Sequence, residues 1–483
     1  MQPSQIQPCL RHAALTELTL PPTITPCLRW LCSDPAGIFF LPIHDIKSPH
    51  AMKSSMPAGG KAPSNHEALG TQAPPDAPPL KLRWVMIGLA FLATVINYLD
   101  RQTLSVVAPE LKKRFAMSDE TYGLILSAFM LAYTVMNGVS GPLLDRIGTR
   151  LGYALCMVWW STAGVLHALV TGPLTLGLCR FLLGMGEAGN WPAAVKVVCE
   201  WFPAKERALA SGIFNSGSAI GAIAAPPLVA WLVLKWGWPT AFLVVGVTGY
   251  FWLAVWWFVY HTPERVRREV QVRPAPAWRL LRTRFVGFFT LSKVFMDPVW
   301  YFYIFWFPKY LSSVHGFTLA DIGRTAWIPF LTADIGNLAG GLLTRTLIRF
   351  DVPLPLAPKV SCAVFALLMT SAIPASLTSD AATAIALVST ATFGYTGYLA
   401  NTLAFPAEVF PKNTVGSIWG LASMGAGFGG MVFSWLSGRL IDRYGYTPVF
   451  IGYGILPLAA LAIVLFLIGP LRPHPEFQKT SES

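Results

Sequence analysis

The chain has 483 residues, of which 54% are hydrophobic and only 12% are charged, and its formal net charge at pH 7 is +12. Soluble domains carry about 25% charged residues, so this composition excludes one large water-soluble core and indicates a protein surrounded mostly by lipid. Seven cysteines without metal-ligand spacing predict neither a metal site nor a disulfide framework.

Residues 1–80 differ from the rest of the chain. They are rich in Pro, Ala and Ser, contain no run typical of a signal peptide, and end in a stretch (57–79) with the composition of a linker. We expect a disordered N-terminal extension here. We also expect translation to start at Met52 or Met56 rather than at Met1, because nothing upstream has the composition of a membrane protein.

Twelve apolar runs follow between Leu82 and Pro470, each close to the roughly 20 residues that span a bilayer as a helix. Backbone groups in lipid must be paired within their own segment, so the runs predict helices and an all-α membrane protein. The expected helix starts are Trp84, Tyr122, Leu151, Leu174, Ala208, Pro239, Phe285, Ile322, Pro355, Ala381, Val415 and Pro448.

The runs form two groups of six, residues 81–260 and 285–470, followed by a tail at 471–483. The segment between them, 261–284, holds seven arginines against two glutamates. This clustering argues against nucleic-acid binding, and the positive-inside bias predicts a cytoplasmic linker with both termini on the same side. A basic cluster at 110–115 falls on the outer side in this orientation, opposite to the bias. Because the bias is statistical, we keep the orientation. We expect a multi-pass protein of the bacterial inner membrane.

Helix one carries two adjacent charges. The stretch "INYLDRQTLS" (96–105) places Asp100 and Arg101 in a run that is otherwise apolar. Charges at membrane depth cost several kcal/mol unless they are paired or hydrated, so they indicate a functional site.

Helix four carries two more charges, within "CRFLLGMGEAGNWP" (179–192). Arg180, Gly184, Glu187 and Trp191 are spaced 4, 3 and 4 apart, which predicts one helix face. Arg180 and Glu187 would lie two turns, or about 10 Å, apart and could bracket a small ligand. The alternative is a buried ion pair that joins helices one and four through Asp100.

Polar and aromatic side chains on other helices complete the expected site. They are Tyr133 and Asn137 in helix two, Asn215 in helix five, Trp306 in helix seven, and Tyr395, Tyr398 and Asn401 in helix ten. Arginine suits a carboxylate, amides suit hydroxyls, and rings suit the CH faces of a sugar, so the set predicts binding of a polyhydroxylated anion. For any single aromatic residue, packing is the simpler explanation.

The two halves of the chain repeat each other. A shift of 208 residues maps Gly212, Gly217, Gly221 and Gly246 onto Gly420, Gly425, Gly429 and Gly454, and a shift of 200 maps Gly123, Asn137 and Gly141 onto Gly323, Asn337 and Gly341. The repeat predicts two pseudo-symmetric six-helix bundles with a central site and access from alternate sides. Most of these glycines should serve close helix packing. Arg180 and Glu187 map onto Val388 and Tyr395, so their charges are not a general packing requirement.

The loop "GPLLDRIGTR" (141–150) resembles the major facilitator superfamily motif G-x-x-x-D-R-x-G-x-R at Gly141, Asp145, Arg146, Gly148 and Arg150. Helix one, "RFLLGMGEAGNWPAAVK" in helix four and "EWFPAKERALASGIFNSGSAIGAIAAPPL" in helix five resemble the anion:cation symporter family, most closely its hexuronate transporter branch. The resemblance covers roughly residues 82–470.

The resemblance implies twelve helices and uptake of organic anions, mostly sugar acids, with protons. It assigns the arginine and acidic roles of helices one and four to Asp100, Arg101, Arg180 and Glu187, with Glu187 or Asp100 as the proton-coupling acid. In the second half Arg345 replaces the motif aspartate, so Asp145, with Arg146 and Arg150, is expected to act at a gate that a helix N-terminus of the opposite bundle closes.

We therefore expect a monomeric secondary transporter that imports a hexuronate with protons, uses no cofactor and draws energy from the proton gradient. Uptake of galactonate or glucarate is the nearest alternative. An efflux antiporter would need the pattern G-x-x-x-G-P-x-x-G-G in helix five, where "GSAIGAIAAPPL" (217–228) misplaces the proline. A membrane enzyme would need a catalytic cluster, but His167, His261 and His315 are isolated in the sequence.

Overall fold

The computed structural model describes residues 80–203, 206–262, 280–410 and 412–471. The expected N-terminal extension up to residue 79, most of the basic linker and the tail from residue 472 lie outside these residues, and so do Met52 and Met56. The described residues belong to one compact unit of the chain.

The first half of the described chain forms six spanning segments. They are α1 (Leu80–Arg114), α2 (Asp119–Ile147), α3 (Thr149–Leu166) with the 3-10 turn η2 (His167–Leu169), α4 (Pro173–Glu187) with α5 (Asn190–Trp201), α6 (Arg207–Trp236) and α7 (Trp238–Val259).

The second half forms six more. They are α10 (Arg284–His315), α11 (Leu319–Thr325) with α12 (Ile328–Arg349), α13 (Ala357–Met369) with α14 (Ala372–Ala375), α15 (Ala381–Thr402) with α16 (Phe405–Val409), α17 (Lys412–Tyr444), and α18 (Thr447–Ala462) with the π turn η3 (Ile463–Leu467). All twelve segments begin within four residues of their expected starts, which confirms the all-α fold with twelve spans.

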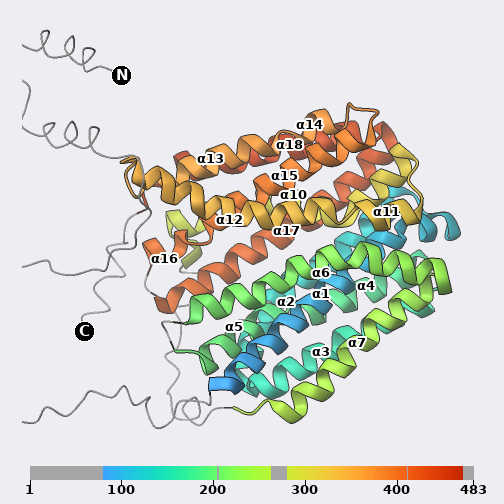
Figure 1. The fold of residues 1–483 in the computed structure, drawn as a ribbon, viewed down its shortest axis with the longest axis horizontal. Coiled ribbons are helices and arrows are strands. Elements are labelled where there is room, and N and C mark those ends of the chain that lie inside the picture. Colours follow the sequence, from blue (N-terminus) through green and yellow to red (C-terminus); the bar gives the residue numbers. More distant parts are fainter. Residues whose placement is uncertain (1–79, 204–205, 263–279, 411, 472–483) are drawn as a thin grey trace, which may run out of the picture. The chain divides into compact units, whose positions relative to one another are not determined.

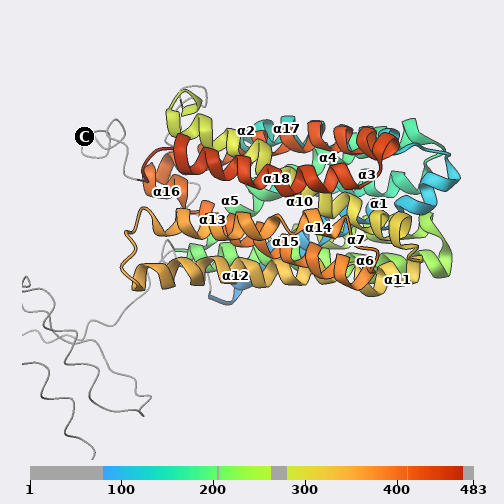
Figure 2. The same cartoon turned by 90° about the horizontal axis from the view of Figure 1, so that it is seen from above.

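The helices run side by side (Figures 1 and 2), and α1–α7 form one group and α10–α18 the other (Figure 1). Seven described helices are long and apolar enough to cross a membrane. The other five spans are interrupted by turns or carry more polar residues. Outward-facing side chains such as Phe258 and Phe466, which are 87% and 74% exposed, suit a surface that contacts lipid.

Glycines of the repeat make equivalent close contacts inside each group. A Cβ on Gly217 of α6 would lie 2.5 Å from the Phe91 carbonyl oxygen of α1, and a Cβ on Gly425 of α17 would lie 2.7 Å from that of Thr290 in α10. The two helices of each pair therefore approach too closely for any side chain larger than hydrogen. This contact explains why the glycine spacing recurs after 208 residues.

Other glycines have different surroundings at the two ends of the molecule. At the end that carries the turn before Asp119, here called the Asp119 end, a Cβ on Gly123 would lie 2.6 Å from the Ser434 carbonyl oxygen. At the opposite end, called the Asp145 end, a Cβ on Gly141 or Gly420 would meet nothing within 4 Å. The two groups are therefore in close contact at the Asp119 end, whereas these two glycines face open space at the Asp145 end.

The expected continuous face of helix four is interrupted. Helix α4 ends at Glu187 and α5 begins at Asn190, so Trp191 belongs to a different helix from Arg180 and Glu187. Pro192 has no N–H to donate to the carbonyl of residue 188, four positions earlier. The Ala188 carbonyl instead accepts a hydrogen bond from Ser140 Oγ of α2 at 3.4 Å.

We predict opposite effects for two identical substitutions, one in α2 and one in α17. Gly123→Ala should lower the melting temperature, because overpacking costs about 1–3 kcal/mol. Gly420→Ala should leave it unchanged or raise it, because alanine favours a helix by up to about 1 kcal/mol over glycine. Thermal unfolding of both purified variants measures this. A Gly123→Ala melting temperature at or above that of the unsubstituted protein would contradict the packing argument.

Candidate functional site

A buried ion pair joins α1 to α4. Arg101 Nε lies 2.8 Å from Glu187 Oε2, and the two side chains are 2% and 0% exposed. The structure thus pairs Glu187 with Arg101, whereas the sequence suggested an ion pair through Asp100. In a lipid-embedded bundle each of these charges would be costly alone, so neither can lose its partner without another charge taking its place.

Aromatic rings surround the Arg101 guanidinium. Its carbon lies 4.7 Å from the ring centre of Tyr133 and 5.3 Å from those of Tyr98 and Phe129. Cation–π attraction from three rings partly replaces the water that a buried guanidinium has lost. Tyr133 therefore lies beside Arg101, as expected for a residue of the same site.

Arg180 is fully buried next to this pair. Its Nη1 donates to the Arg101 carbonyl oxygen at 3.5 Å. Its Nε and Nη2, together with Arg101 Nη2 and Glu187 Oε1, have no hydrogen-bond partner among the described residues. Buried charged groups are normally fully hydrogen-bonded, so these atoms form the strongest candidate for a ligand site.

Asp100 contacts helix α3. Its Oδ1 would lie 3.0 Å from a Cβ on Gly164 of α3, and it forms no ion pair with any described residue. The ion pair between α1 and α4 is therefore made by Arg101, and the role of Asp100 as a proton-coupling acid stays a prediction.

The other expected site residues of the first half are Asn137, Trp191 and Asn215, and each has a different environment. Asn137 follows Tyr133 by one turn, and its amide nitrogen is buried without a partner among the described residues. Trp191 packs edge-on against Phe214 at 5.6 Å, and Asn215, which follows Phe214, is half-buried. Sequence reasoning missed Asn190, whose amide oxygen accepts from Tyr153 and whose nitrogen donates to Thr94.

A second charged cluster lies in the other bundle. Lys293 Nζ is 3.4 Å from Asp297 Oδ1, which also accepts a hydrogen bond from the Tyr395 hydroxyl at 3.2 Å. The Tyr395 ring stacks on Trp300 at 5.2 Å. The sequence shows Lys293 and Asp297 as charges inside an apolar run, the same signal that singled out Asp100 and Arg101.

Two other expected ligands of the second half have structural partners. The Asn401 amide nitrogen donates to Gly340 O, Ser361 Oγ and Gly397 O, and its oxygen accepts from Thr344. These bonds hold α15 against α12 and α13. The Asn401 amide therefore has protein partners for its nitrogen and its oxygen and is not needed by a ligand. Trp306 packs edge-on against Tyr122 at 5.0 Å, near the Asp119 end.

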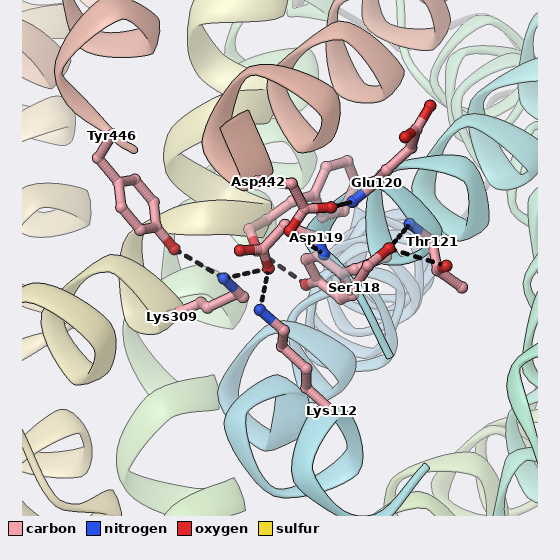
Figure 3. A network of polar contacts seen from close by, with 10 residues as sticks. Lys112, Ser118, Asp119, Glu120, Thr121, Lys309, Asp442 and Tyr446 are labelled. Carbon is pink, nitrogen blue, oxygen red and sulfur yellow. Dashed lines mark hydrogen bonds and ion pairs between the residues drawn. The ribbon is translucent and has the colours of Figure 1, made fainter. Parts of the chain in front are cut away.

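Polar contacts between the bundles close the Asp119 end (Figure 3). Asp119 Oδ1 lies 2.6 Å from Lys112 Nζ and 2.5 Å from Lys309 Nζ, and Lys309 also donates to the Tyr446 hydroxyl. The Asp442 carboxylate accepts from the backbone N–H groups of Asp119 and Glu120 at 2.8 and 2.6 Å. A carboxylate from α17 thus binds the N-terminus of α2, where the helix dipole favours negative charge.

At the Asp145 end the motif residues contact their own bundle. Lys196 Nζ lies 2.6 Å from Asp145 Oδ1, and Arg150 donates to the Trp257 carbonyl. Arg146 is exposed. In this structure the contact expected for Asp145, with a helix N-terminus of the opposite bundle, is instead made by Asp442 at the other end.

Residues 90–405 match the family model described as Major Facilitator Superfamily. The chain belongs to the major facilitator superfamily. Members of this superfamily are transporters rather than enzymes, and the twelve spans in two bundles agree with that assignment.

Individual relatives narrow this assignment. The chain is 33% identical to the "Hexuronate transporter" of Escherichia coli (strain K12) over 82% of its own length and 96% of the relative's. It is 35% identical to the "Galacturonate transporter" of Dickeya chrysanthemi over 60% and 89%. A solved bacterial homologue of the lysosomal transporter Spinster shares the fold, with a TM-score of 0.63 and 22% identity over 81% of this chain and 96% of that one. The similarity to hexuronate transporters that the motifs indicated is confirmed.

We predict that Asp442→Asn will loosen the Asp119 end, because it removes the charge that binds the N-terminus of α2. Loss of a charge–dipole contact of about 1 kcal/mol should raise the open fraction roughly fivefold. With Ser127→Cys as a reporter, since Ser127 Oγ bonds the Met431 carbonyl across the interface, alkylation should accelerate by that factor.

Asp321→Asn is the matched control for this substitution. Asp321 also binds the N-terminus of a helix at this end. That helix is its own, α11, whereas Asp442 binds a helix of the opposite bundle. Equal alkylation rates in the Asp442→Asn and Asp321→Asn proteins would refute the role of Asp442 in closure.

Proposed function

We propose that the protein imports a sugar acid, a hexuronate such as glucuronate or galacturonate, by proton symport and alternating access. The observation that carries this proposal is the Arg101–Glu187 pair beside Arg180, whose buried donors Nε and Nη2 have no partner among the described residues. A planar guanidinium binds a carboxylate through two parallel hydrogen bonds, so Arg180 can hold the acid group of a substrate.

The remaining side chains support a polyhydroxylated substrate. Tyr133 and Asn137 in α2 can contact its ring and hydroxyl groups, and Tyr395 and Trp300 in the opposite bundle offer further aromatic surface. The names of the relatives agree with this chemistry, because hexuronate, galacturonate, galactarate and galactonate are all sugar acids. An aldonate or aldarate is therefore the second candidate substrate.

We place the Asp145 end in the cytoplasm and the Asp119 end outside, in the bacterial inner membrane. The seven arginines at 261–284 support this orientation, because this segment runs from the end of α7 to the first residue of α10, at the Asp145 end. The described arrangement then corresponds to the inward-open state of a monomeric transporter.

The ion pair suggests how proton and substrate are coupled. Protonation of Glu187 would remove the counter-charge of Arg101, and the substrate carboxylate would then supply the missing negative charge. Proton and substrate would therefore favour each other's binding, and this coupling must be reciprocal. Asp100 is the alternative proton carrier, since one of its oxygens is buried without a partner among the described residues.

Uptake into proteoliposomes tests the function directly. An inward proton gradient should drive accumulation of radiolabelled glucuronate or galacturonate above the outside concentration, and dissipation of the gradient should abolish it. Inhibition of this uptake by unlabelled galactonate or glucarate would rank the affinities of the four acids. Failure to accumulate any of these acids would refute the proposal, and efflux of a cationic drug would favour the antiporter alternative.

We predict that Glu187→Gln will separate binding from energy coupling. Glutamine resembles the protonated acid, so the variant should bind substrate and exchange it across the membrane without dependence on pH. It should fail to accumulate substrate against a gradient. If Glu187→Gln still concentrates the acid, Glu187 is not the coupling group, and Asp100→Asn becomes the decisive variant.

A further inference from the structure

A cavity of about 350 Å³ opens at the Asp119 end, between α1 of the first bundle and α10 of the second. All the charged side chains that line it are lysines, namely Lys112, Lys113 and Lys309, and Ser312 and Ser313 add hydroxyl groups. Ligand pockets have volumes of roughly 300–1,000 Å³, so this cavity has room for a small anion.

The charged groups of the cavity are three lysines, two of which are paired with Asp119. Lys112 and Lys309 share one carboxylate oxygen, Asp119 Oδ1, at 2.6 and 2.5 Å. Two ammonium groups thus share one carboxylate oxygen, and the exposed Lys113 adds a third cation. The Asp442 carboxylate accepts from the backbone N–H groups of Asp119 and Glu120 and does not pair with these lysines. Lys309 is only 1% exposed, so its charge is held in place and poorly screened by solvent.

We propose that this lysine pocket is a second anion site, which captures the carboxylate of the sugar acid from outside before transport. The proposal rests on the function and orientation proposed above. The ammonium groups would bind the carboxylate, and the two serines would bind hydroxyl groups of the sugar.

Occupation of the lysine pocket would also favour opening of the outer side. The incoming carboxylate and Asp119 compete for the same two ammonium groups, so the anion binds best when Asp119 has separated from them. A ligand shifts an equilibrium toward the state that it binds more tightly. Sugar acid in the pocket would therefore weaken the contact of α2 with α10 and expose the central site.

The first test compares Lys113→Gln with Lys235→Gln. Lys113 lines the pocket but is not part of the Asp119 contacts. Lys235 belongs to the last turn of α6 at the same end and lies over the rings of Trp231 and Trp236. Both variants remove one positive charge from the same side of the membrane, so only the position of the charge differs.

In proteoliposomes at low salt, Lys113→Gln should raise the KM for glucuronate uptake roughly three- to tenfold with kcat nearly unchanged, because loss of a local charge weakens electrostatic capture. High salt should remove the difference. Lys235→Gln should keep the KM of the unsubstituted protein, and Lys113→Arg should restore it. An equal KM in the two glutamine variants overturns the proposal and leaves Lys113 as a basic residue that stabilises the C-terminus of α1.

A second test does not depend on transport. In right-side-out vesicles, Ser313→Cys should react faster with an anionic than with a cationic methanethiosulfonate, and Lys113→Gln should reduce that preference severalfold. Vesicles without the Ser313→Cys substitution provide the blank. Millimolar glucuronate should protect the cysteine more than equimolar inorganic phosphate does.

The two tests separate this inference from the proposed function. Equal protection by phosphate, or no effect of reagent charge, overturns the sugar-acid pocket even where uptake is normal. Absence of uptake by the unsubstituted protein refutes the proposed function instead, while selective protection by glucuronate would still support the pocket.

Discussion

The site of this protein depends on one constraint, which is that a buried arginine in a membrane must keep a negative partner. Glu187 supplies that partner for Arg101 at 2.8 Å, and both side chains are almost inaccessible to solvent. Arg180, about two turns from Glu187 on the same helix, has no comparable carboxylate among the described residues. In the proposed cycle the substrate carboxylate completes this charge balance. This cycle would couple transport to protons. Protonation of Glu187 removes one buried negative charge and the anionic substrate adds one, so the two together keep the net charge of the site unchanged.

The two ends of the molecule depend on an antiparallel crossing of α2 and α17. Helix α2 begins where α17 ends, so the carboxylate of Asp442, near the end of α17, reaches the N-terminus of α2. The same geometry would let Asp145, near the end of α2, reach the N-terminus of α17 at the other end. Both aspartates precede a glycine with positive φ, Gly148 at +81° and Gly445 at +76°, which turns the chain sharply into the next helix. One contact is formed and the other is open, as expected for a transporter that exposes one side at a time.

Much of this arrangement could be predicted from the sequence, because helix length, the repeat and the motif are local signals. The spacing Gly438, Asp442, Arg443, Gly445 repeats that of "GPLLDRIGTR" and would have located the closed gate. What the sequence could not give is the direction of side chains and the choice between partners. Asn401 looks like a ligand by type, yet its amide holds three helices together. Asp100 looks like the residue that joins helix one to helix four, yet the ion pair with Glu187 is made by its neighbour Arg101.

Helix α10 offers a physical connection between the central site and the closed end. Five of its residues recur every fourth position and so share one inclined row, Lys293, Asp297, Tyr301, Phe305 and Lys309. The row begins at the second charged cluster, continues with Tyr301 stacked on Phe305, and ends at the lysine that binds Asp119. Phe305 packs edge-on against Phe129, a ring of the Arg101 cage, and its carbonyl accepts from the Tyr122 hydroxyl of α2. A substrate that displaces Arg101 or its rings would press on this row, and a rigid helix transmits that displacement to Lys309. Contact between Asp119 and α10 would then depend on whether the central site is occupied, because the same helix contacts both the site and the closed end.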